Sequence, residues 1–171
     1  MNAPNASTSA LVANACHAVE VADLAVLGSV TLPARTARHA PPPSTLHPRL
    51  EALLQRCYPD GLYTHQCAAL VAHLGGDNVC LATPTASGKS LPFMAAAAEA
   101  VLRNPRARVL VLYPARALIQ DQAQKWAAFL AELNLSYTFI DGSVPCAERA
   151  GLVARHPIVL MTPDVAHAWL L

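Results

Sequence analysis

The chain has 171 residues, of which 54% are hydrophobic and 13% are charged, and this is enough for one domain with its own core. A formal net charge of +1 excludes a globally basic protein, so any nucleic-acid contact must come from a local face. Five cysteines without C-x-x-C spacing, and no apolar run of membrane-spanning length, exclude a disulfide framework, a zinc site and a membrane partner, and we expect a reduced, cytoplasmic protein.

The N-terminal quarter of the chain lacks amphipathic order. Residues 1 to about 22 are rich in Ala, Asn, Ser and Thr, and the stretch PARTARHAPPPS that follows clusters prolines, which remove backbone donors. We therefore predict a mobile or extended segment over residues 1–44. A folded domain is predicted over residues 45–171, where apolar periodicity begins.

Two amphipathic helices open this domain. Apolar residues recur at i, i+3, i+4 and i+7 in HPRLEALLQRC and again in THQCAALVAHL, a spacing that indicates one buried helical face. Thr64 is a candidate N-cap for the second helix, which ends at LGGD. The residues expected on these two faces are Leu50, Leu53, Leu54 and Cys57, then Cys67, Leu70, Val71 and Leu74.

Strands and helices then alternate. Strands are predicted over 78–82, 107–113, 136–140 and 157–161, with Cys80 as a small buried side chain in the first of them. Helices are predicted between them, and Trp126 and Phe129 fall on the apolar stripe of the longest. Continuous apolar strands are typical of parallel sheets covered on both faces, so the predicted class is α/β, doubly wound, with right-handed crossovers.

The segment TPTASGKS, between the first of these strands and its helix, has the outline of a phosphate-binding loop. Gly88 permits close approach of the backbone, Lys89 supplies an ammonium for phosphate oxygens, and Ser90 supplies a hydroxyl for Mg²⁺. The start of the helix adds the positive end of its dipole. The loop residues expected to bind nucleotide are Thr83, Pro84, Thr85, Ala86, Ser87, Gly88, Lys89 and Ser90.

Three further candidate segments follow strands at their C-terminal ends, where ligands bind in open parallel sheets. Arg116, in YPARAL, can hold a backbone phosphate or be an ordinary surface arginine. Gly142 lies in the turn IDGS, a weak motif by itself. Thr162 and Asp164, in MTPD, can cap a helix, bind phosphate at its N-terminus, or do both.

Taken in order, these segments resemble the motifs of superfamily 2 DEAD/DEAH-box helicases. LYTHQ (62–66) is similar to their Q-motif region, TPTASGKS to motif I, YPARAL to motif Ia and TPD to motif Ib. Members of that superfamily commonly carry Ala or Thr in place of the first P-loop glycine, as Thr83 does here. The chain looks most similar to the YprA-like, mitomycin-repair group of DNA helicases, over about residues 24–171.

This resemblance implies a RecA-like P-loop NTPase fold, with ATP and Mg²⁺ as cofactors and DNA as partner. It implies that Gln66 reads the adenine edge, that Tyr63 or its neighbours contact the base, and that Ser90 binds Mg²⁺. It also places one group of residues along a single DNA strand, where they contact the backbone and do not read sequence, namely Arg116, Gly142, Thr162 and Asp164.

The chain departs from the family by having no Asp-Glu dipeptide. In the family, that motif holds Mg²⁺ and orients the attacking water, and a second RecA-like domain supplies arginine fingers. We therefore expect a RecA-like domain that is incomplete at its C-terminus, does not hydrolyse ATP alone, and has the remainder of a helicase as a possible partner chain. Two alternatives stay open: a non-catalytic fragment that binds nucleic acid or a partner, and another P-loop enzyme such as a kinase.

Overall fold

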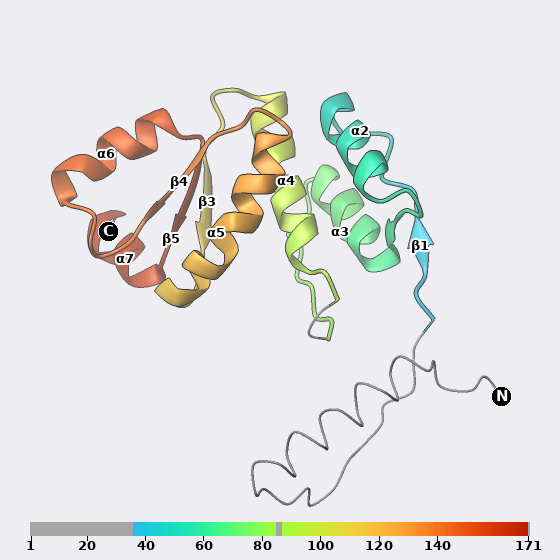
Figure 1. Ribbon diagram of the computed structural model, residues 1–171, viewed down its shortest axis with the longest axis horizontal. Coiled ribbons are helices and arrows are strands. Elements are labelled where there is room, and N and C mark those ends of the chain that lie inside the picture. Colours follow the sequence, from blue (N-terminus) through green and yellow to red (C-terminus); the bar gives the residue numbers. More distant parts are fainter. Residues whose placement is uncertain (1–35, 85–86, 171) are drawn as a thin grey trace, which may run out of the picture. The chain divides into compact units, whose positions relative to one another are not determined.

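The structure is a computed structural model that describes residues 36–84 and 87–170, and a compact unit begins at Ala37 (Figure 1). The predicted N-terminal segment up to residue 35 lies outside the described residues, as do Thr85 and Ala86 of the loop. Among the described helices, none is both long enough and apolar enough to cross a membrane.

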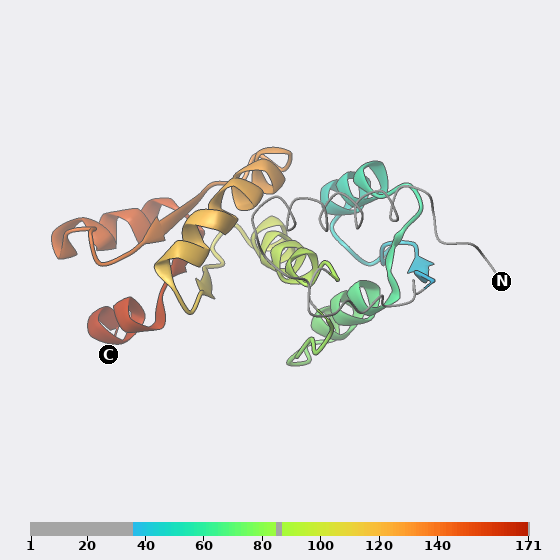
Figure 2. The same ribbon diagram turned by 60° about the horizontal axis from the view of Figure 1, so that its bottom comes forward.

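The first half of the unit is a group of helices beside a short hairpin-like ladder. Strand β1 (His39–Ala40) pairs antiparallel with β2 (Leu62–Tyr63), a pairing that the sequence analysis did not predict. Helices α2 (Pro48–Cys57) and α3 (Thr64–Leu74) flank this ladder, and α4 (Ser90–Arg103) packs beside both. In Figures 1 and 2, α4 separates these helices from the rest of the unit.

The second half is a parallel sheet with a helix after each strand. Its elements are β3 (Val109–Leu112), α5 (Arg116–Ala131), β4 (Tyr137–Ile140), α6 (Cys146–Arg155), β5 (Ile158–Met161) and α7 (Pro163–Leu170). The strand order is β3-β5-β4, so β5 lies in the centre and all four of its residues are buried. Register pairs Val109 and Tyr137 with Ile158, on either side of the central strand. The predicted α/β class, with a parallel sheet, is confirmed.

Side chains alternate between the two faces of this sheet and form two separate cores. On one face, Ile158 and Leu160 pack with α4 and α5, and Trp126 is fully buried there, as its place on the apolar stripe predicts. On the other face, Val159 and Met161 pack with α6 and α7. Helices therefore cover both faces, which explains why β5 is apolar throughout.

The prediction of a strand over residues 78–82 was wrong. These residues have no regular secondary structure and no ladder partner among the described residues, and Cys80, predicted to be buried, is exposed. The outer edge of β3 is also unpaired within the described part of the chain, with Leu110 and Leu112 about half exposed. An apolar run becomes a strand only where another strand accepts its backbone hydrogen bonds, and no described strand does so here.

Smaller differences concern the two opening helices. Thr64 is the first residue of α3, so Tyr63 is the N-cap position in its place. Cys57 and Val71, predicted on the buried faces, are exposed, whereas Leu50 and Leu70 are buried as predicted. Cys57 is the last residue of α2, whereas in α3 the terminal Leu74 packs against the core and the earlier Val71 lies off the buried face.

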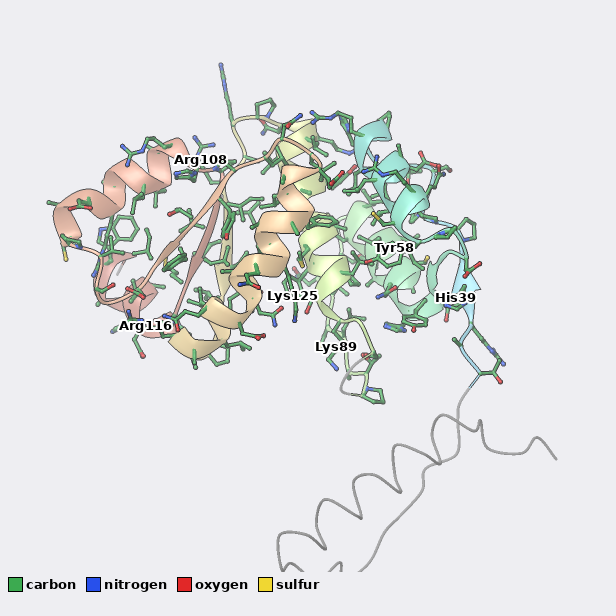
Figure 3. The ribbon with its side chains drawn as sticks, in the orientation of Figure 1. His39, Tyr58, Lys89, Arg108, Arg116 and Lys125 are labelled. Atoms are coloured by element: carbon green, nitrogen blue, oxygen red, sulfur yellow. The ribbon has the colours of Figure 1, made fainter. Side chains whose placement is uncertain are left out.

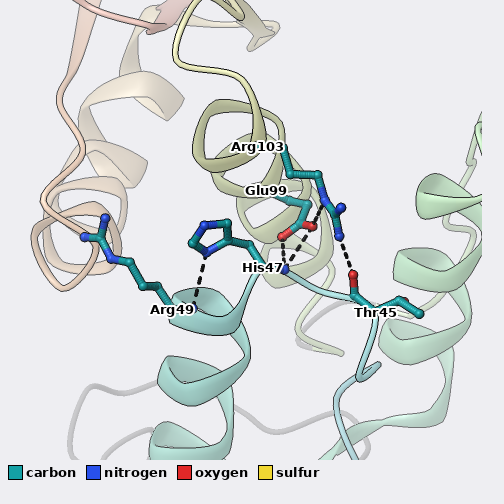
Figure 4. Close-up of polar contacts among 5 residues, drawn as sticks. All are labelled: Thr45, His47, Arg49, Glu99 and Arg103. Carbon is teal, nitrogen blue, oxygen red and sulfur yellow. Dashed lines mark hydrogen bonds and ion pairs between the residues drawn. The ribbon is translucent and has the colours of Figure 1, made fainter.

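A buried carboxylate fastens α2 to α4 (Figure 4). Both carboxylate oxygens of Glu99, which is 2% exposed, accept the His47 backbone N–H at 2.8 and 3.0 Å, immediately before α2. Arg103, one turn later on α4, donates to Glu99 and to the Thr45 carbonyl. A negative charge at the N-terminus of α2 is also favoured by the helix dipole.

We predict that Glu99→Ala lowers the free energy of unfolding by about 1–3 kcal/mol, because it leaves a buried N–H without an acceptor. Glu99→Gln keeps an acceptor oxygen and should lose less. Urea unfolding followed by circular dichroism measures both changes. Glu132→Ala is the matched control, since it removes an exposed ion pair with Arg56 and should change stability by no more than about 0.5 kcal/mol. Equal stability of Glu99→Ala and the wild type would contradict the assigned role.

Candidate functional site

The loop before α4 is organised around the ammonium group of Lys89. Its Nζ donates to the carbonyls of Thr83 and Pro84, both at 2.6 Å, and the Thr83 and Ser87 hydroxyls hydrogen-bond at 2.7 Å. Gly88 has φ +73°, a left-handed conformation that side chains disfavour. The loop therefore folds back on Lys89, as it must if this ammonium is to meet an anion at the loop centre.

Helix α3 is attached to this loop by two side chains from its first turn. Gln66 is 4% exposed, and its Nε2 donates to the Gly88 carbonyl at 2.9 Å while its Oε1 accepts the Tyr63 N–H at 2.9 Å. His65 Nε2 lies 3.0 Å from the Ser87 carbonyl oxygen. A Cβ on Gly88 would lie 2.5 Å from Gln66 Nε2, so this contact requires glycine.

Gln66 and the loop border the same cavity, of about 1020 Å³. The cavity lies between the end of α2, the turn before β2, the starts of α3 and α4, and one side of α5. Pockets for small ligands commonly have several hundred Å³, so a nucleotide fits in this volume. Residues that line it include Cys57, Tyr58, Tyr63, Gln66, Gly88, Ser90, Met94, Lys125 and Phe129.

Lys89 does not line this cavity. It borders a second one, of about 510 Å³, together with Phe93 and residues 77–79 and 81. Ser90, the next residue, lines the larger cavity, so consecutive residues of the loop border two different cavities.

Tyr63 lies in a group of three rings, two of which, His39 and Tyr63, line the larger cavity. Its ring stacks with His39, at a centroid distance of 5.0 Å, and with His65, at 5.7 Å. His39 is its cross-strand partner in the β1–β2 ladder, so the ladder sets the position of this tyrosine. Neither histidine was predicted as a site residue, although His65 lies within the LYTHQ motif.

A second cluster lies at the carboxyl ends of the strands. Arg116 is the first residue of α5, and its Nε forms an ion pair with Asp141 Oδ2 at 2.7 Å, at the end of β4. Asp141 Oδ1 accepts the Ser143 N–H at 2.9 Å and also the Ser143 hydroxyl. In Figure 3, Arg116 and Lys89 lie toward the same end of the unit, whereas Arg108, before β3, lies at the opposite end.

Asp141 is the buried centre of this cluster, with 2% of its surface exposed. The Ser143 hydroxyl, together with the Ser143 N–H and the Arg116 guanidinium, outweighs burial and lowers the pKa of Asp141 below its ordinary value of 3.8. The carboxylate is therefore charged at neutral pH. Asp141 was not among the predicted site residues, although an Asp two residues before a Ser in a turn is a recognisable signal for this hydrogen bond.

Within the described part of the chain, the other residues predicted at the strand ends form no hydrogen bond or ion pair with Arg116 or Asp141. Gly142 is exposed beside Asp141, and no atom lies within 4 Å of a Cβ built on it. Thr162 is nearly buried and directly precedes α7, and Asp164 is exposed in its first turn. Because β5 lies between β3 and β4, the parallel strands bring all these residues to one edge of the sheet.

Few of the described side chains are placed to bind a metal ion. Within residues 36–84 and 87–170, no group of three or more His, Cys, Asp or Glu side chains is placed to hold a metal ion. Ser90 supplies one hydroxyl to the larger cavity. This donor set fits Mg²⁺ in the form in which it accompanies a nucleotide, with one or two protein ligands, phosphate oxygens and water.

Known proteins are similar to this chain in sequence. The family model of the DEAD/DEAH box helicases matches residues 63–171. The chain is 31% identical over 140 residues to the ATP-dependent helicase YprA of Bacillus subtilis, covering 80% of this chain and 19% of YprA. It is 29% identical over 145 residues to the ATP-dependent helicase HRQ1 of Saccharomyces cerevisiae, covering 82% of this chain and 13% of HRQ1.

Solved structures give the same result. The chain is similar to the DUF1998 helicase MrfA bound to DNA, with a TM-score of 0.73 and 31% identity over 80% of this chain and 20% of MrfA. For MrfA bound to DNA and AMPPNP the TM-score is 0.70, with 31% identity over 78% of this chain and 19% of MrfA. The chain thus spans about a fifth or less of the length of these relatives. The predicted RecA-like fold class and the resemblance to YprA-like helicases are confirmed, and the chain belongs to the DEAD/DEAH box helicase family.

Proposed function

We propose that this chain is the ATP-binding and nucleic-acid-binding portion of an ATP-dependent DNA helicase, in a partial RecA-like domain over residues 45–171. One observation carries the proposal. Gln66 is hydrogen-bonded to Gly88 in the loop of Lys89, and together with Ser90 it lines a cavity that is large enough for a nucleotide. Relatives that are ATP-dependent helicases, and the MrfA structure with DNA and AMPPNP, support it.

The nucleotide would lie with its phosphates at the loop. Lys89 exchanges the carbonyls of Thr83 and Pro84 for phosphate oxygens, because a charged acceptor makes the stronger hydrogen bond. Backbone N–H groups of the loop and the start of α4 provide further donors for phosphate, and Thr85 and Ala86 are included in this proposal. Mg²⁺, held by the Ser90 hydroxyl and phosphate oxygens, would neutralise phosphate charge when bound.

The base would lie toward Gln66 and Tyr63. The Gln66 carboxamide has one N–H and one lone pair beyond its bonds to Gly88 and Tyr63, and these can face the adenine edge. Because the Tyr63 ring stacks with two imidazoles, its edge and hydroxyl are offered to the base as well.

The DNA strand would follow the strand-end residues, Arg116, Gly142, Thr162 and Asp164. Arg116 is exposed at the N-terminus of α5, and Gly142 leaves space for close approach of a phosphate. Such residues contact the sugar-phosphate backbone of a single strand and do not distinguish one base from another. Asp164 would lie along the strand at the start of α7 without binding a phosphate directly, since its carboxylate repels phosphate.

We predict that Lys89→Ala weakens binding of an ATP analogue with Mg²⁺ by at least about tenfold, as expected for the loss of a charge-assisted hydrogen bond. Isothermal titration calorimetry measures the change. Lys125→Ala removes an exposed lysine on α5 that borders the larger cavity and not the loop of Lys89, and as the matched control it should retain most of the affinity. Unchanged affinity in Lys89→Ala would reject the loop as the phosphate site.

We predict that Gln66→Ala loses the preference for adenine over guanine nucleotides, because the donor and acceptor that face the base edge are removed. Competition of ADP and GDP against a fluorescent nucleotide measures the preference in both proteins. Thermal melting of the variant controls for loosening of the loop, which also loses its bond to Gly88. A preference retained in a folded variant would remove Gln66 from the base site.

We predict that Arg116→Ala weakens binding of single-stranded DNA and reduces the slope of log K against log[salt] by about 1, as one lost phosphate contact requires. Fluorescence anisotropy with a labelled oligothymidylate between ~50 and 200 mM salt measures both quantities. Arg108→Ala, at the opposite end of the sheet, is the control with equal loss of charge. Equal salt slopes for Arg116→Ala and the wild type would exclude this strand contact.

A further inference from the structure

The contact between Arg116 and Asp141 joins two segments that are far apart in the sequence. Arg116 begins α5, and Asp141 follows β4. The side chain of Arg116 is 57% exposed, whereas that of Asp141 is 3% exposed. One end of the ion pair is therefore fixed inside the protein, and the other end reaches into solvent.

The position of Arg116 is electrostatically unfavourable without a partner. It stands at the first position of α5, where the positive end of the helix dipole repels a guanidinium. The first turn of α5 contains no acidic residue, and its N-cap, Ala115, has no side-chain acceptor. Asp141 supplies the missing negative charge from another element.

The ion pair with Asp141 is made at the Nε atom of the Arg116 guanidinium. Asp141 Oδ2 lies 2.7 Å from Nε, and within the described residues no hydrogen bond involves the two terminal nitrogens of Arg116. Those nitrogens carry four N–H groups in a planar fork, which matches the oxygens of a phosphate. Lysine has no equivalent of Nε, so it cannot be held from behind in this way.

Asp141 is itself held in place. Its Oδ1 accepts both the N–H and the hydroxyl of Ser143, which leaves Oδ2 for Arg116. Because these bonds are made inside the turn after β4, the carboxylate cannot rotate without breaking them. The orientation of Arg116 is thereby set by the sheet and not by the exposed start of α5 alone.

We propose that Asp141 is a positioning residue for nucleic-acid binding, which holds Arg116 by Nε so that its two terminal nitrogens face a backbone phosphate. This proposal rests on the proposed function, since it concerns the strand contact of Arg116. Ser143, in turn, fixes Asp141. The ligand class is a single-stranded nucleic acid, contacted through its phosphates.

Asp141→Asn is the first test. Asparagine keeps an oxygen for Ser143 and loses the charge that holds Arg116. We expect single-stranded DNA affinity to fall by about three- to tenfold, the range of coupling within one salt-bridge network, even though the variant gains a unit of positive charge. Asp121→Asn gains the same charge at an exposed site on α5, where the described partners of Asp121 are Lys125 and Gln122, and should not weaken binding. Unchanged or tighter binding by Asp141→Asn would overturn the proposal.

A double-mutant cycle separates positioning from general stability. In the Arg116→Ala background, Asp141→Asn should have no further effect on DNA affinity, because there is no guanidinium left to position. An equal loss in both backgrounds would show a structural role and overturn the proposal. Binding of the ATP analogue, which does not involve Asp141, shows that each variant is folded.

Arg116→Lys provides a test that leaves Asp141 intact. It keeps the charge but loses Nε and the planar fork, so DNA affinity should fall nearly as far as in Arg116→Ala. Affinity equal to that of the wild type would mean that charge alone matters, and the proposal would fail. If the wild type shows no salt-dependent DNA binding, the strand part of the proposed function fails and the inference falls with it. If Arg116→Ala weakens binding and Asp141→Asn does not, only the inference fails.

Discussion

The buried carboxylate of Glu99 fixes α2 against α4 within the first half of the unit. It lies on α4, the helix that begins at the phosphate-binding loop, and it accepts the N–H that starts α2. The far end of α2 forms a wall of the larger cavity. One hydrogen-bonded acid therefore fixes the distance between the loop and the wall that faces it, and a shift of α2 would change the cavity directly.

The candidate nucleotide site and the candidate strand site use the same physical device. In each, an exposed or half-buried cation is held by oxygens: carbonyls of the same loop for Lys89, and a buried carboxylate from another segment for Arg116. The difference lies in the charge of the acceptor. Neutral carbonyls are easily exchanged for phosphate oxygens, whereas the charged Asp141 stays bound, so Lys89 is ready to move and Arg116 to remain oriented.

Local patterns predicted most of the fold, since helical spacing and continuous apolar runs depend on neighbours in the sequence. Trp126 in the core and the central strand β5 are examples. The loop of Lys89 was recognisable because its residue types have few other uses in that order. The wrong or missing predictions concern contacts between distant parts of the chain. Residues 78–82 form a strand only beside a partner strand, and the role of Asp141 depends on its ion pair with Arg116, 25 positions earlier. Nothing in either segment indicates what the rest of the chain places beside it.

The direction in which the sheet is wound has a consequence for its open side. The chain passes from β3 to β4 over the face of α5 and returns from β4 to β5 over the face of α6, and these two moves have the same hand. Helix α7 also lies on the face of α6, and both moves leave the outer edge of β3 without a partner strand among the described residues. The cavities beside β3 and beside residues 77–81 share Phe93 and Ala96 as lining residues. A strand added there would pair with β3, cover Leu110 and Leu112, and give residues 78–82 the neighbour that a strand requires.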